Sequence, residues 1–292
     1  MDRPSFLFII NPNSGTTTGK KSDEIARKIK STAAEFDVEA EIIFTQAQGH
    51  AKEIVKNHKD LKSWKAIVAI GGDGTVNEIA SGLVNTNTAV GILPMGSGNG
   101  LARHLGIPMD IEKALEKLFN GTETTIDSAL INDIPFFCTA GVGFDAHVGK
   151  LFSEQKTRGL FTYMKVTFQS FWNYQPQNFL LNQIQKNAFS ITIANAGQYG
   201  NNAWIAPQAS VTDGQLNICT IHKFPSWYGV PMVYQLFSKT MKNSRYIEYQ
   251  FASNALLETQ VPPIIHYDGE PLQLSTNRLE IKIKPNSLKI IL

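Results

Sequence analysis

The sequence predicts an α/β fold in two parts: a doubly wound parallel sheet first, then a β-rich antiparallel, sandwich-like domain. Strand-like and helix-like patterns alternate four times in the first part, as is typical of parallel strands connected by helices. After about residue 122, β-branched and alternating runs dominate, as is typical of antiparallel strands. We expect a first domain at 1–122, a second at 123–284, and a terminal strand at about 285–292 that can return to the first.

Four apolar runs predict the strands of the parallel sheet. Residues 5–10 and 65–70 are continuously apolar, as strands buried on both faces are, and two weaker runs cover 38–44 and 89–93. Helical patterns lie between them at about 19–34, 50–58, 75–84 and 99–119, the last broken near Gly106 and Pro108. In such a sheet, a ligand binds at the carboxyl ends of the strands.

The overall composition excludes some classes of protein. The chain has 27 Lys and Arg against 25 Asp and Glu, and a net charge of +2 gives no electrostatic case for nucleic-acid binding. No apolar run approaches the roughly 18 residues that span a bilayer. Cys138 and Cys219 lie in apolar runs without metal-ligand spacing, which favours reduced thiols and a cytoplasmic protein. The sequence leaves open whether the chain forms a homodimer.

The turn after the third strand, GGDGTVNE, has the features of a phosphate site. Gly71, Gly72 and Gly74 let the backbone turn sharply and let a phosphate approach its N–H groups. Thr75 is expected to cap the following helix, whose N-terminal dipole also favours anions. Asp73 is the exception in an anion site, and it suits a carboxylate that binds Mg²⁺ through water or accepts a proton from a hydroxyl. The alternative is a Gly-rich turn in which the Asp only forms the turn.

Two further loops rich in Gly and hydroxyl side chains follow other strands of this sheet. They are NPNSG at 11–15, after the first strand, and PMGSGN at 94–99, after the fourth; Thr45 ends the second strand. Because the carboxyl ends of parallel strands meet at one sheet edge, we expect these loops to gather around one ligand. The segment GVGFDA at 141–146 resembles a dinucleotide fingerprint, but it lies in the β-rich half and lacks the following acidic residue.

Six motifs occur in order over nearly the whole chain: NPNSG, GGDGTVNE, PMGSGNGLAR, GVGFDA, ANAGQYG with IAPQASVTDGQL, and YDGE. Together they resemble the diacylglycerol kinase catalytic-domain family, which includes bacterial soluble lipid kinases, sphingosine kinases and ceramide kinases. A GGDG turn also occurs in NAD kinases and phosphofructokinases, but the residues NE directly after GGDGTV favour the lipid kinases.

The resemblance implies an ATP-dependent kinase that acts on a lipid at a membrane surface, with the lipid entering the β-rich domain. It also implies which residues hold ATP: Asn11, Pro12, Asn13, Ser14, Gly15, Thr45, Gly71, Gly72, Asp73, Gly74, Thr75, Val76, Asn77 and Ser97.

The same resemblance implies the catalytic and metal-binding residues. Glu270 of the DGE motif is expected to be the general base on the lipid hydroxyl, and Asp73 to organise Mg²⁺ and phosphates. A swap of these two roles is left open, because sphingosine kinases are usually described with the position of Asp73 as the base. A structural Mg²⁺ is expected on the loop SVTDGQ, held by Asp213 and the backbone carbonyls of Ser210 and Gln215; hard oxygen donors suit that ion.

The sequence departs from the bacterial diacylglycerol kinase pattern at two positions. Gly100 stands where those enzymes commonly have an acidic residue, and Thr212 where a second Asp can precede DG. The acceptor lipid, a diacylglycerol or a sphingoid lipid, is therefore open. Two alternatives also stay open: a kinase of a soluble acceptor on the same fold, and a nucleotide-binding regulatory protein that has lost catalysis.

A helical stripe rich in aromatic residues occupies the segment GLFTYMKVTFQSFW. Apolar residues recur at positions 160, 161, 164, 168, 171 and 172, for which we expect core packing. The alternative is an acyl-chain wall or a membrane-resting surface, assisted by Lys156, Arg158 and Lys165.

Overall fold

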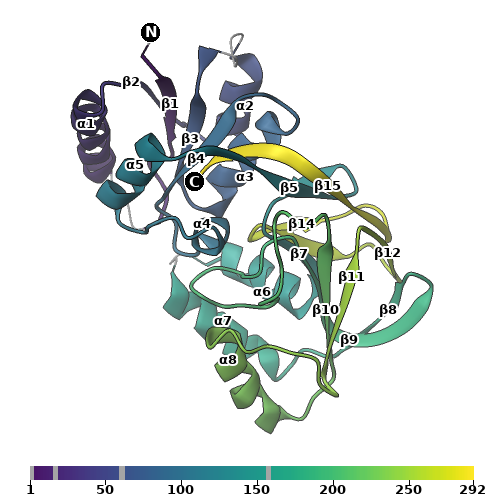
Figure 1. The fold of residues 1–292 in the computed structure, drawn as a ribbon. Helices are drawn as coiled ribbons and strands as arrows, with labels where there is room; N and C mark the ends of the chain where they lie inside the picture. The colour runs from purple at the N-terminus through teal and green to yellow at the C-terminus, as the bar shows by residue number, and fades with distance from the viewer. Residues whose placement is uncertain (1–2, 16–18, 59–62, 156–158) are drawn as a thin grey trace. The chain divides into compact units, whose positions relative to one another are not determined.

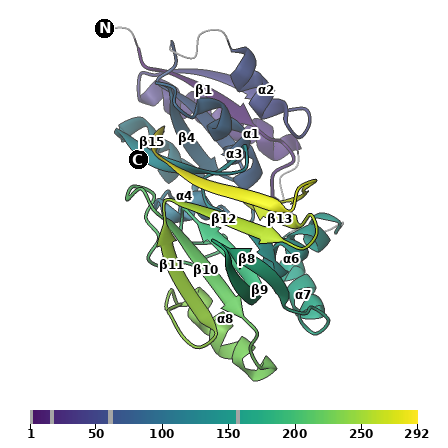
Figure 2. The ribbon, with the colours of Figure 1, turned by 90° about the vertical axis from the view of Figure 1, so that its right-hand side faces the viewer.

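The computed structural model describes residues 3–15, 19–58, 63–155 and 159–292 of the chain. The chain forms two compact units. The first contains residues Met1–Ile126 and Asn286–Leu292, and the second contains Asp127–Pro285. The strands of the first unit are mainly parallel and those of the second are antiparallel, and each unit is described by itself (Figures 1 and 2).

The first unit is built on a parallel sheet with the strand order β2-β1-β3-β4. Strands β1, β3 and β4 are buried almost throughout, whereas β2, at the edge, alternates between exposed and half-buried residues. The expected α/β fold and its four parallel strands are confirmed. The strands are β1 (Ser5–Ile10), β2 (Glu39–Phe44), β3 (Ala66–Gly71) and β4 (Ala89–Pro94).

Helices cover both faces of this sheet (Figure 1). In one pair of helices, Phe36, which directly follows the helix 19–35, packs against Phe119 of the helix 111–120, with ring centroids 5.4 Å apart. In the other pair, Gly82 of the helix 73–83 faces Val55 of the helix 50–57. Residues 105–110 separate two helices, so the expected break near Gly106 and Pro108 is confirmed. The helices are α1 (Gly19–Glu35), α2 (His50–Asn57), α3 (Asp73–Leu83), α4 (Gly100–His104) and α5 (Ile111–Asn120).

The end of the last strand, β15 (Arg278–Ile291), belongs to the first unit. Ile290 is paired in parallel with Val90 of β4, and the N–H of Asn85 donates to the carbonyl of Ser287 at 2.7 Å. The chain therefore completes its first sheet with residues about 200 positions beyond β4.

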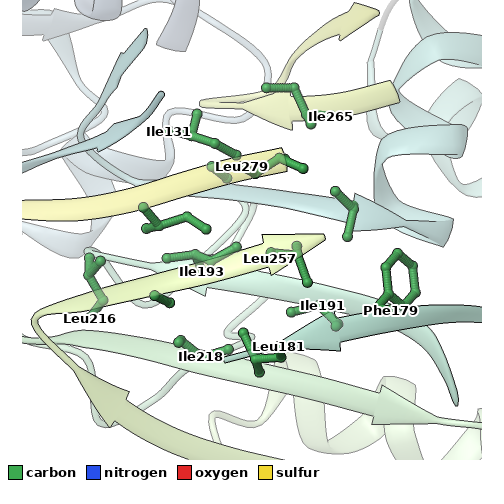
Figure 3. Close-up of a cluster of buried hydrophobic side chains, with 14 of the residues drawn as sticks. Ile131, Phe179, Leu181, Ile191, Ile193, Leu216, Ile218, Leu257, Ile265 and Leu279 are labelled. Carbon is green, nitrogen blue, oxygen red and sulfur yellow. The ribbon is translucent and has the colours of Figure 1, made fainter. Parts of the chain in front are cut away.

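The second unit is antiparallel and β-rich, as expected. Its strand order is β14-β13-β7-β9-β8-β12-β15, with β10 paired to β9 and β11 to β10. Side chains such as Ile191, Leu257 and Leu279 form a fully apolar core between these strands (Figure 3). The remaining strands are β5 (Glu123–Ile131), β6 (Ile134–Phe136), β7 (Thr139–Gly143), β8 (Gln177–Leu181), β9 (Ile184–Ala194), β10 (Leu216–His222), β11 (Ile247–Ala252), β12 (Asn254–Thr259), β13 (Ile264–Tyr267) and β14 (Glu270–Gln273).

In the described part of the second unit, three α-helices and one short 3₁₀ helix pack against a second hydrophobic cluster. It is called the aromatic core below, because Phe189 and Tyr246 are buried in it and Phe171, Phe224 and Tyr228 pack against it. The helices are α6 (Phe144–Ser153), α7 (Leu160–Phe171), η2 (Ser226–Tyr228) and α8 (Gly229–Phe237). Residues 172–176 connect α7 to β8.

The expectation that the stripe on α7 packs into a core is wrong for most of its residues. Phe161, Phe168 and Trp172 are exposed, whereas Phe171 packs against the aromatic core and Val166 is buried. Hydrophobic periodicity shows that a helix has an apolar face, but it does not show whether a protein core covers that face. Of the cations expected beside it, Lys165 is exposed on α7, and Lys156 and Arg158 lie outside the described residues.

Candidate active site

The three Gly-rich loops of the first unit meet at the carboxyl ends of β1, β3 and β4, as their positions in the sequence predict. The N–H of Gly72 donates to Ser14 Oγ at 3.1 Å, and Asn11 Nδ2 donates to Thr75 Oγ1 at 3.1 Å. The loop after β4 is tied to the same turn, because the N–H groups of Met95 and Gly96 both donate to the carbonyl of Gly71. Each loop is therefore hydrogen-bonded to the turn that contains Asp73.

Glycine is required where these loops touch. A Cβ built on Gly96 would lie 2.4 Å from the Cα of Gly72, and one on Gly15 would lie 2.5 Å from the carbonyl oxygen of Met95. Gly15 also has a φ of +64°, which side chains rarely adopt. The loops are thus in backbone-to-backbone contact, and no side chain separates them at these two glycines.

The N-terminus of α3 lies at this edge, where its geometry favours an anion. The helix begins at Asp73 with Gly72 as its N-cap, so the expectation that Thr75 caps it is wrong. Thr75 lies in the first turn, buried, and its hydroxyl accepts from Asn11 instead. The amides of the first turn of a helix have no partner within the helix, and together with the helix dipole they favour a phosphate.

Asp73 connects two helix ends. Its Oδ1 accepts the N–H of Gly100, the first residue of α4, at 2.7 Å. The main chain before Gly100 is shaped by Asn99, which has a φ of +52° and makes two hydrogen bonds to Gly96. Gly100 thus contacts Asp73 through its backbone N–H, which every residue type except proline has.

The other residues expected to hold ATP in this unit lie around the same loops. Thr45 follows β2 and is buried, and its N–H donates to the carbonyl of Ile10 at 2.8 Å. The side chains of Val76 and Asn77 are buried within α3, and Ser97 is exposed in the loop after β4. Pro12 and Asn13 lie in the loop after β1, where the N–H of Asn13 donates to Asn11 Oδ1.

Sequence reasoning missed the structural role of Glu78. Its two carboxylate oxygens accept the N–H groups of Gly49 and Ala51, at 2.8 and 3.1 Å, at the start of α2. The motif residue that follows Asn77 therefore holds a neighbouring helix end. No local pattern indicates this, because the two partners precede Glu78 by 29 and 27 residues.

The DGE motif lies in the second unit, in the hairpin between β13 and β14. Asp268 and Gly269 both have positive φ, as a tight hairpin turn requires. The carboxylate of Asp268 is buried and accepts three backbone N–H groups, from Phe137, Cys138 and Thr139. Glu270 is half-buried at the start of β14. Asp268 is thus an anchor of the hairpin that presents Glu270.

The loop 210–215, expected to bind Mg²⁺, is also part of the second unit. Asp213 Oδ1 accepts the N–H of Gln215 at 3.0 Å, and Ser210 Oγ lies 3.1 Å from the hydroxyl of Thr212. Asp127 holds the loop in place, because its Oδ2 accepts the N–H of Gly214 at 2.8 Å. Carboxylate and carbonyl oxygens are the donors that Mg²⁺ prefers, so this loop fits that ion by its chemistry.

The segment GVGFDA builds a buried polar cluster in the second unit. Asp145 Oδ2 accepts from Thr192 Oγ1 at 2.8 Å and from Tyr199 Oη at 3.0 Å, and lies 3.1 Å from His266 Nε2. Burial, followed by the negative charge of Asp145, raises the pKa of Tyr199 well above its usual value, so this phenol stays a neutral donor. A Cβ on Gly141 would lie 2.9 Å from His266 Nε2, so this glycine makes room for the cluster.

A cavity of about 780 Å³ lies between α6, α7 and the start of β8. His147 and Tyr174 line both it and a second, neighbouring cavity. Partial burial, followed by the charge of Lys150, lowers the pKa of His147, so its imidazole is neutral at neutral pH. The volume is in the range of small-molecule sites.

No helix in the described ranges of the chain has the length and hydrophobicity that crossing a bilayer requires.

Comparison with known proteins agrees with the geometry of both units. The diacylglycerol kinase catalytic domain matches residues 5–131, and the YegS C-terminal NAD kinase β-sandwich-like domain matches residues 138–292. The chain is 29% identical to "Probable lipid kinase YegS" of Escherichia fergusonii over 99% of its own length and 96% of that protein. It is 33% identical to an uncharacterised protein of Synechocystis, over 97% and 69% of the two chains.

Solved structures share the fold. A diacylglycerol kinase from Bacillus anthracis superposes with a TM-score of 0.73 at 20% identity, covering 100% of this chain and 97% of that one. An NAD kinase from Archaeoglobus fulgidus in complex with ATP superposes with a TM-score of 0.51 at 12% identity, covering 98% and 93%. On the two domain matches and the full-length relatives, the chain belongs to the diacylglycerol kinase and YegS-like lipid kinase family.

Proposed function

We propose that this kinase transfers the γ-phosphoryl group of MgATP to a hydroxyl of a diacylglycerol or a related glycerolipid or sphingoid lipid. The observation that supports it best is the meeting of three Gly-rich loops around the N-terminus of α3, where main-chain groups suit a phosphate tail. The relatives named lipid kinases support a lipid acceptor. The NAD kinase of the same fold, solved with ATP, supports ATP as the donor.

In this proposal the loops after β1, β3 and β4, with Thr45, Asn77 and Ser97, hold ATP. The acceptor oxygen attacks the γ-phosphorus, the bond from that phosphorus to the bridging oxygen of ADP breaks, and the hydroxyl proton passes to a carboxylate. Positioning and charge neutralisation do most of the work in this chemistry, so fixed main-chain donors are suitable catalysts.

Glu270 is the proposed general base and Asp73 the proposed organiser of Mg²⁺ and phosphates. The half-buried position of Glu270 on a hairpin anchored by Asp268 suits a carboxylate that must be held in place. At Asp73, Mg²⁺ would neutralise charge on the phosphates. A second, structural Mg²⁺ would be held by Asp213 and the carbonyls of Ser210 and Gln215.

We place the acceptor lipid in the second unit. The cavity beside α7 has a volume that suits part of a lipid, and His147 there is a neutral hydrogen-bonding group. Because such an acceptor resides in a bilayer, the enzyme is proposed to be cytoplasmic and peripheral to the membrane.

A radiolabelled ATP assay tests the proposal. We expect labelled lipid from a panel of diacylglycerols and sphingoid bases in detergent micelles, and no label on NAD or sugar phosphates. Label on a soluble acceptor would replace the lipid by that substrate. ATP-dependent thermal stabilisation without any labelled product would indicate a nucleotide-binding regulatory protein instead.

A matched pair of variants tests the base. Glu270→Gln should lower kcat by about two orders of magnitude or more, because a general base contributes roughly 10²–10⁴-fold. Glu280→Gln, at an exposed position of β15, should leave kcat unchanged. Near-normal turnover of Glu270→Gln together with loss in Asp73→Asn would transfer the role of base to Asp73.

A further inference from the structure

Two helical segments of the second unit present large apolar side chains outward. On α7 these side chains are spaced by three, four and four residues, and on α8 they fall at i, i+3, i+4 and i+7, so each set lies on one face of its helix. All are between 42% and 83% exposed. This set, called the aromatic face below, consists of Phe161, Met164, Phe168, Trp172, Trp227, Val230, Val233, Tyr234 and Phe237.

The outward direction of these side chains is set by the packing of the opposite helix faces. Phe171 of α7 stacks on Phe224 with ring centroids 5.7 Å apart, and Tyr228, Met232 and Leu236 pack against the same aromatic core. Since α7, η2 and α8 share one core, a rotation that buried the outer side chains would remove the inner ones from it. The outward sides of both helical segments are therefore fixed features of this unit.

The stretch of sequence that contains the aromatic face is mainly basic. Between Glu154 and Glu248 the sequence has eight Lys and Arg residues and a single acidic residue, Asp213, although the whole chain is nearly balanced at 27 against 25. Lys186 is neutralised by Glu248 at 2.8 Å. Five exposed cations remain in the described part of this stretch, on α7 or close to α8 in the chain: Lys165, Lys223, Lys239, Lys242 and Arg245.

We infer that the aromatic face, with these five cations, is a docking surface for an anionic lipid bilayer. Trp and Tyr favour the boundary between headgroups and acyl chains, and an aromatic helix face lies in that boundary while neighbouring Lys and Arg attract anionic headgroups. A second copy of the chain is a poorer occupant, because it would bring two surfaces of the same positive charge together. The inference rests on the proposed function, and it names the surface by which this kinase reaches its lipid.

Helix α7 connects the aromatic face to the cavity in which we place the acceptor lipid. Val166, Gln169 and Ser170 line the 780 Å³ cavity, while the outer side chains of the same helix belong to the aromatic face. Docking through α7 would therefore bring the wall of the proposed acceptor site to the bilayer.

Vesicle sedimentation with the whole chain tests the inference. We expect binding to phosphatidylcholine–phosphatidylglycerol vesicles to be roughly tenfold or more tighter than to phosphatidylcholine alone. Phe168→Ser with Tyr234→Ser should weaken binding roughly tenfold or more. Lys165→Ala with Lys242→Ala should weaken binding to the anionic vesicles roughly fivefold per residue, and binding to neutral vesicles very little. Trp172 and Trp227 should shift their fluorescence emission to shorter wavelengths on the anionic vesicles.

The matched control is Ile184→Ser with Phe251→Ser, which removes two apolar side chains of similar exposure, 57% and 51%, outside the aromatic face. It should bind vesicles as the unmodified chain does, and all variants should keep the same melting temperature. Equal vesicle binding by the Phe168/Tyr234 variant and the unmodified chain would overturn the inference. So would a dimer that sediments with no vesicle and that this variant converts to a monomer.

The assay needs no phosphoryl transfer. A chain that binds anionic vesicles through this face but labels no lipid would refute the proposed function and leave the docking surface standing. A chain that phosphorylates lipid in micelles but binds no vesicles would refute the docking surface and leave the proposed function standing.

Discussion

Asp73 holds the N–H of Gly100 with one oxygen, so its negative charge and this hydrogen bond can be removed separately. Asp73→Asn keeps an acceptor oxygen and removes the charge, so we expect turnover to fall by about 10²-fold or more with unfolding free energy little changed. Asp73→Ala removes both, and should also destabilise the chain by about 1 kcal/mol, the usual effect of losing a helix cap. Initial rates with saturating ATP and urea unfolding measure the two effects. Normal turnover in Asp73→Asn would contradict the assigned role.

Asp268 is expected to matter for stability. Its buried carboxylate accepts the N–H groups of residues 137, 138 and 139, and Asp268→Ala would leave three buried donors without an acceptor. Each such group costs about 1–3 kcal/mol, so we expect the unfolding free energy to fall by about 3 kcal/mol or more. Urea unfolding with Glu270→Ala as the control measures this, because Glu270→Ala alters the same hairpin without exposing those donors. A loss in Asp268→Ala no larger than in the control would show that water satisfies the three amides.

At the scale of single residues, the glycines of the three loops and the position of Asp73 could be predicted, because turn chemistry is local. The partners of Glu78 and Asp268 could not. Glu78 accepts from residues 27 and 29 positions away, and Asp268 from residues 129 to 131 positions away. A one-dimensional pattern contains the carboxylate but not the amides that the fold brings to it. A DG dipeptide at a hairpin turn was the available signal at Asp268.

Between elements, the close contact of the loops after β3 and β4 depends on the absence of a side chain at Gly96. A Cβ there would lie 2.4 Å from the Cα of Gly72 and 2.8 Å from Asn99 Oδ1, and backbone atoms cannot yield cheaply. We expect Gly96→Ala to separate the loops, lower the melting temperature and abolish the thermal shift produced by ATP. Differential scanning fluorimetry with and without ATP measures both.

Gly149→Ala is the matched control for that substitution. Gly149 lies inside α6 with open space where a Cβ would stand, so Ala should stabilise the chain by about 0.5–1 kcal/mol and leave the ATP shift intact. An unchanged ATP shift in Gly96→Ala would mean that the contact of these two loops is not needed for nucleotide binding.

The pairing of β9, β10 and β11 includes an ion pair that gives a pH dependence. Lys186 Nζ donates to both oxygens of Glu248, at 2.8 and 2.9 Å, and these hydrogen bonds hold the pKa of Glu248 below its usual value. The unfolded state therefore binds the proton first, so this stabilisation is present above the ordinary Glu pKa and is lost as the pH falls through the lowered one.

Glu248→Gln should lower the unfolding free energy by about 1 kcal/mol at neutral pH, a small value because Glu248 is one-third exposed and its charge is screened. The difference from the unmodified chain should shrink as the pH falls below the ordinary Glu pKa of about 4.3, and disappear once the pH is below the lowered pKa of the folded state. Urea unfolding over this pH range measures it, and Lys186→Met should show the same pH profile. A difference that is constant with pH would exclude the ion pair as its source.

Helices and strands were predicted correctly where the hydrophobic periodicity and the Gly or Pro residues at the ends of the segment agree, as in the four parallel strands and the break after α4. The outward face of α7 was not, because an apolar stripe looks the same whether a core or a bilayer covers it. Residues 177–181 are a second example of structure that the local sequence does not determine. Taken alone they are compatible with a helix, but they form a strand that pairs with β9 and β12. Pairing partners distant in sequence override weak local preference.

At the scale of the whole molecule, the chain passes between the units twice, near residue 126 and near residue 285. The first sheet is therefore complete only when residues 286–292 join it. Leu288, Ile290 and Ile291 are buried in that unit, and Ile290 pairs with Val90. From the sequence alone, residues 285–292 are assigned only as a strand that can return to the first domain, because both parts of the chain offer apolar partners.

Ile290→Ala tests how far the first unit depends on this strand. Truncating a fully buried Ile usually costs about 2–5 kcal/mol, so we expect a loss of that size in urea unfolding. Lys289→Ala, its neighbour, removes only a 4.0 Å ion pair with Glu123 and should change stability by less than about 0.5 kcal/mol. Hydrogen exchange should accelerate in β3 and β4 but not in β9, because the cavity forms in the core of the first unit alone. Equal acceleration in β9 would show that the two units unfold as one cooperative system, in which case a defect in the last strand would weaken the second unit as much as the Gly-rich loops of the first.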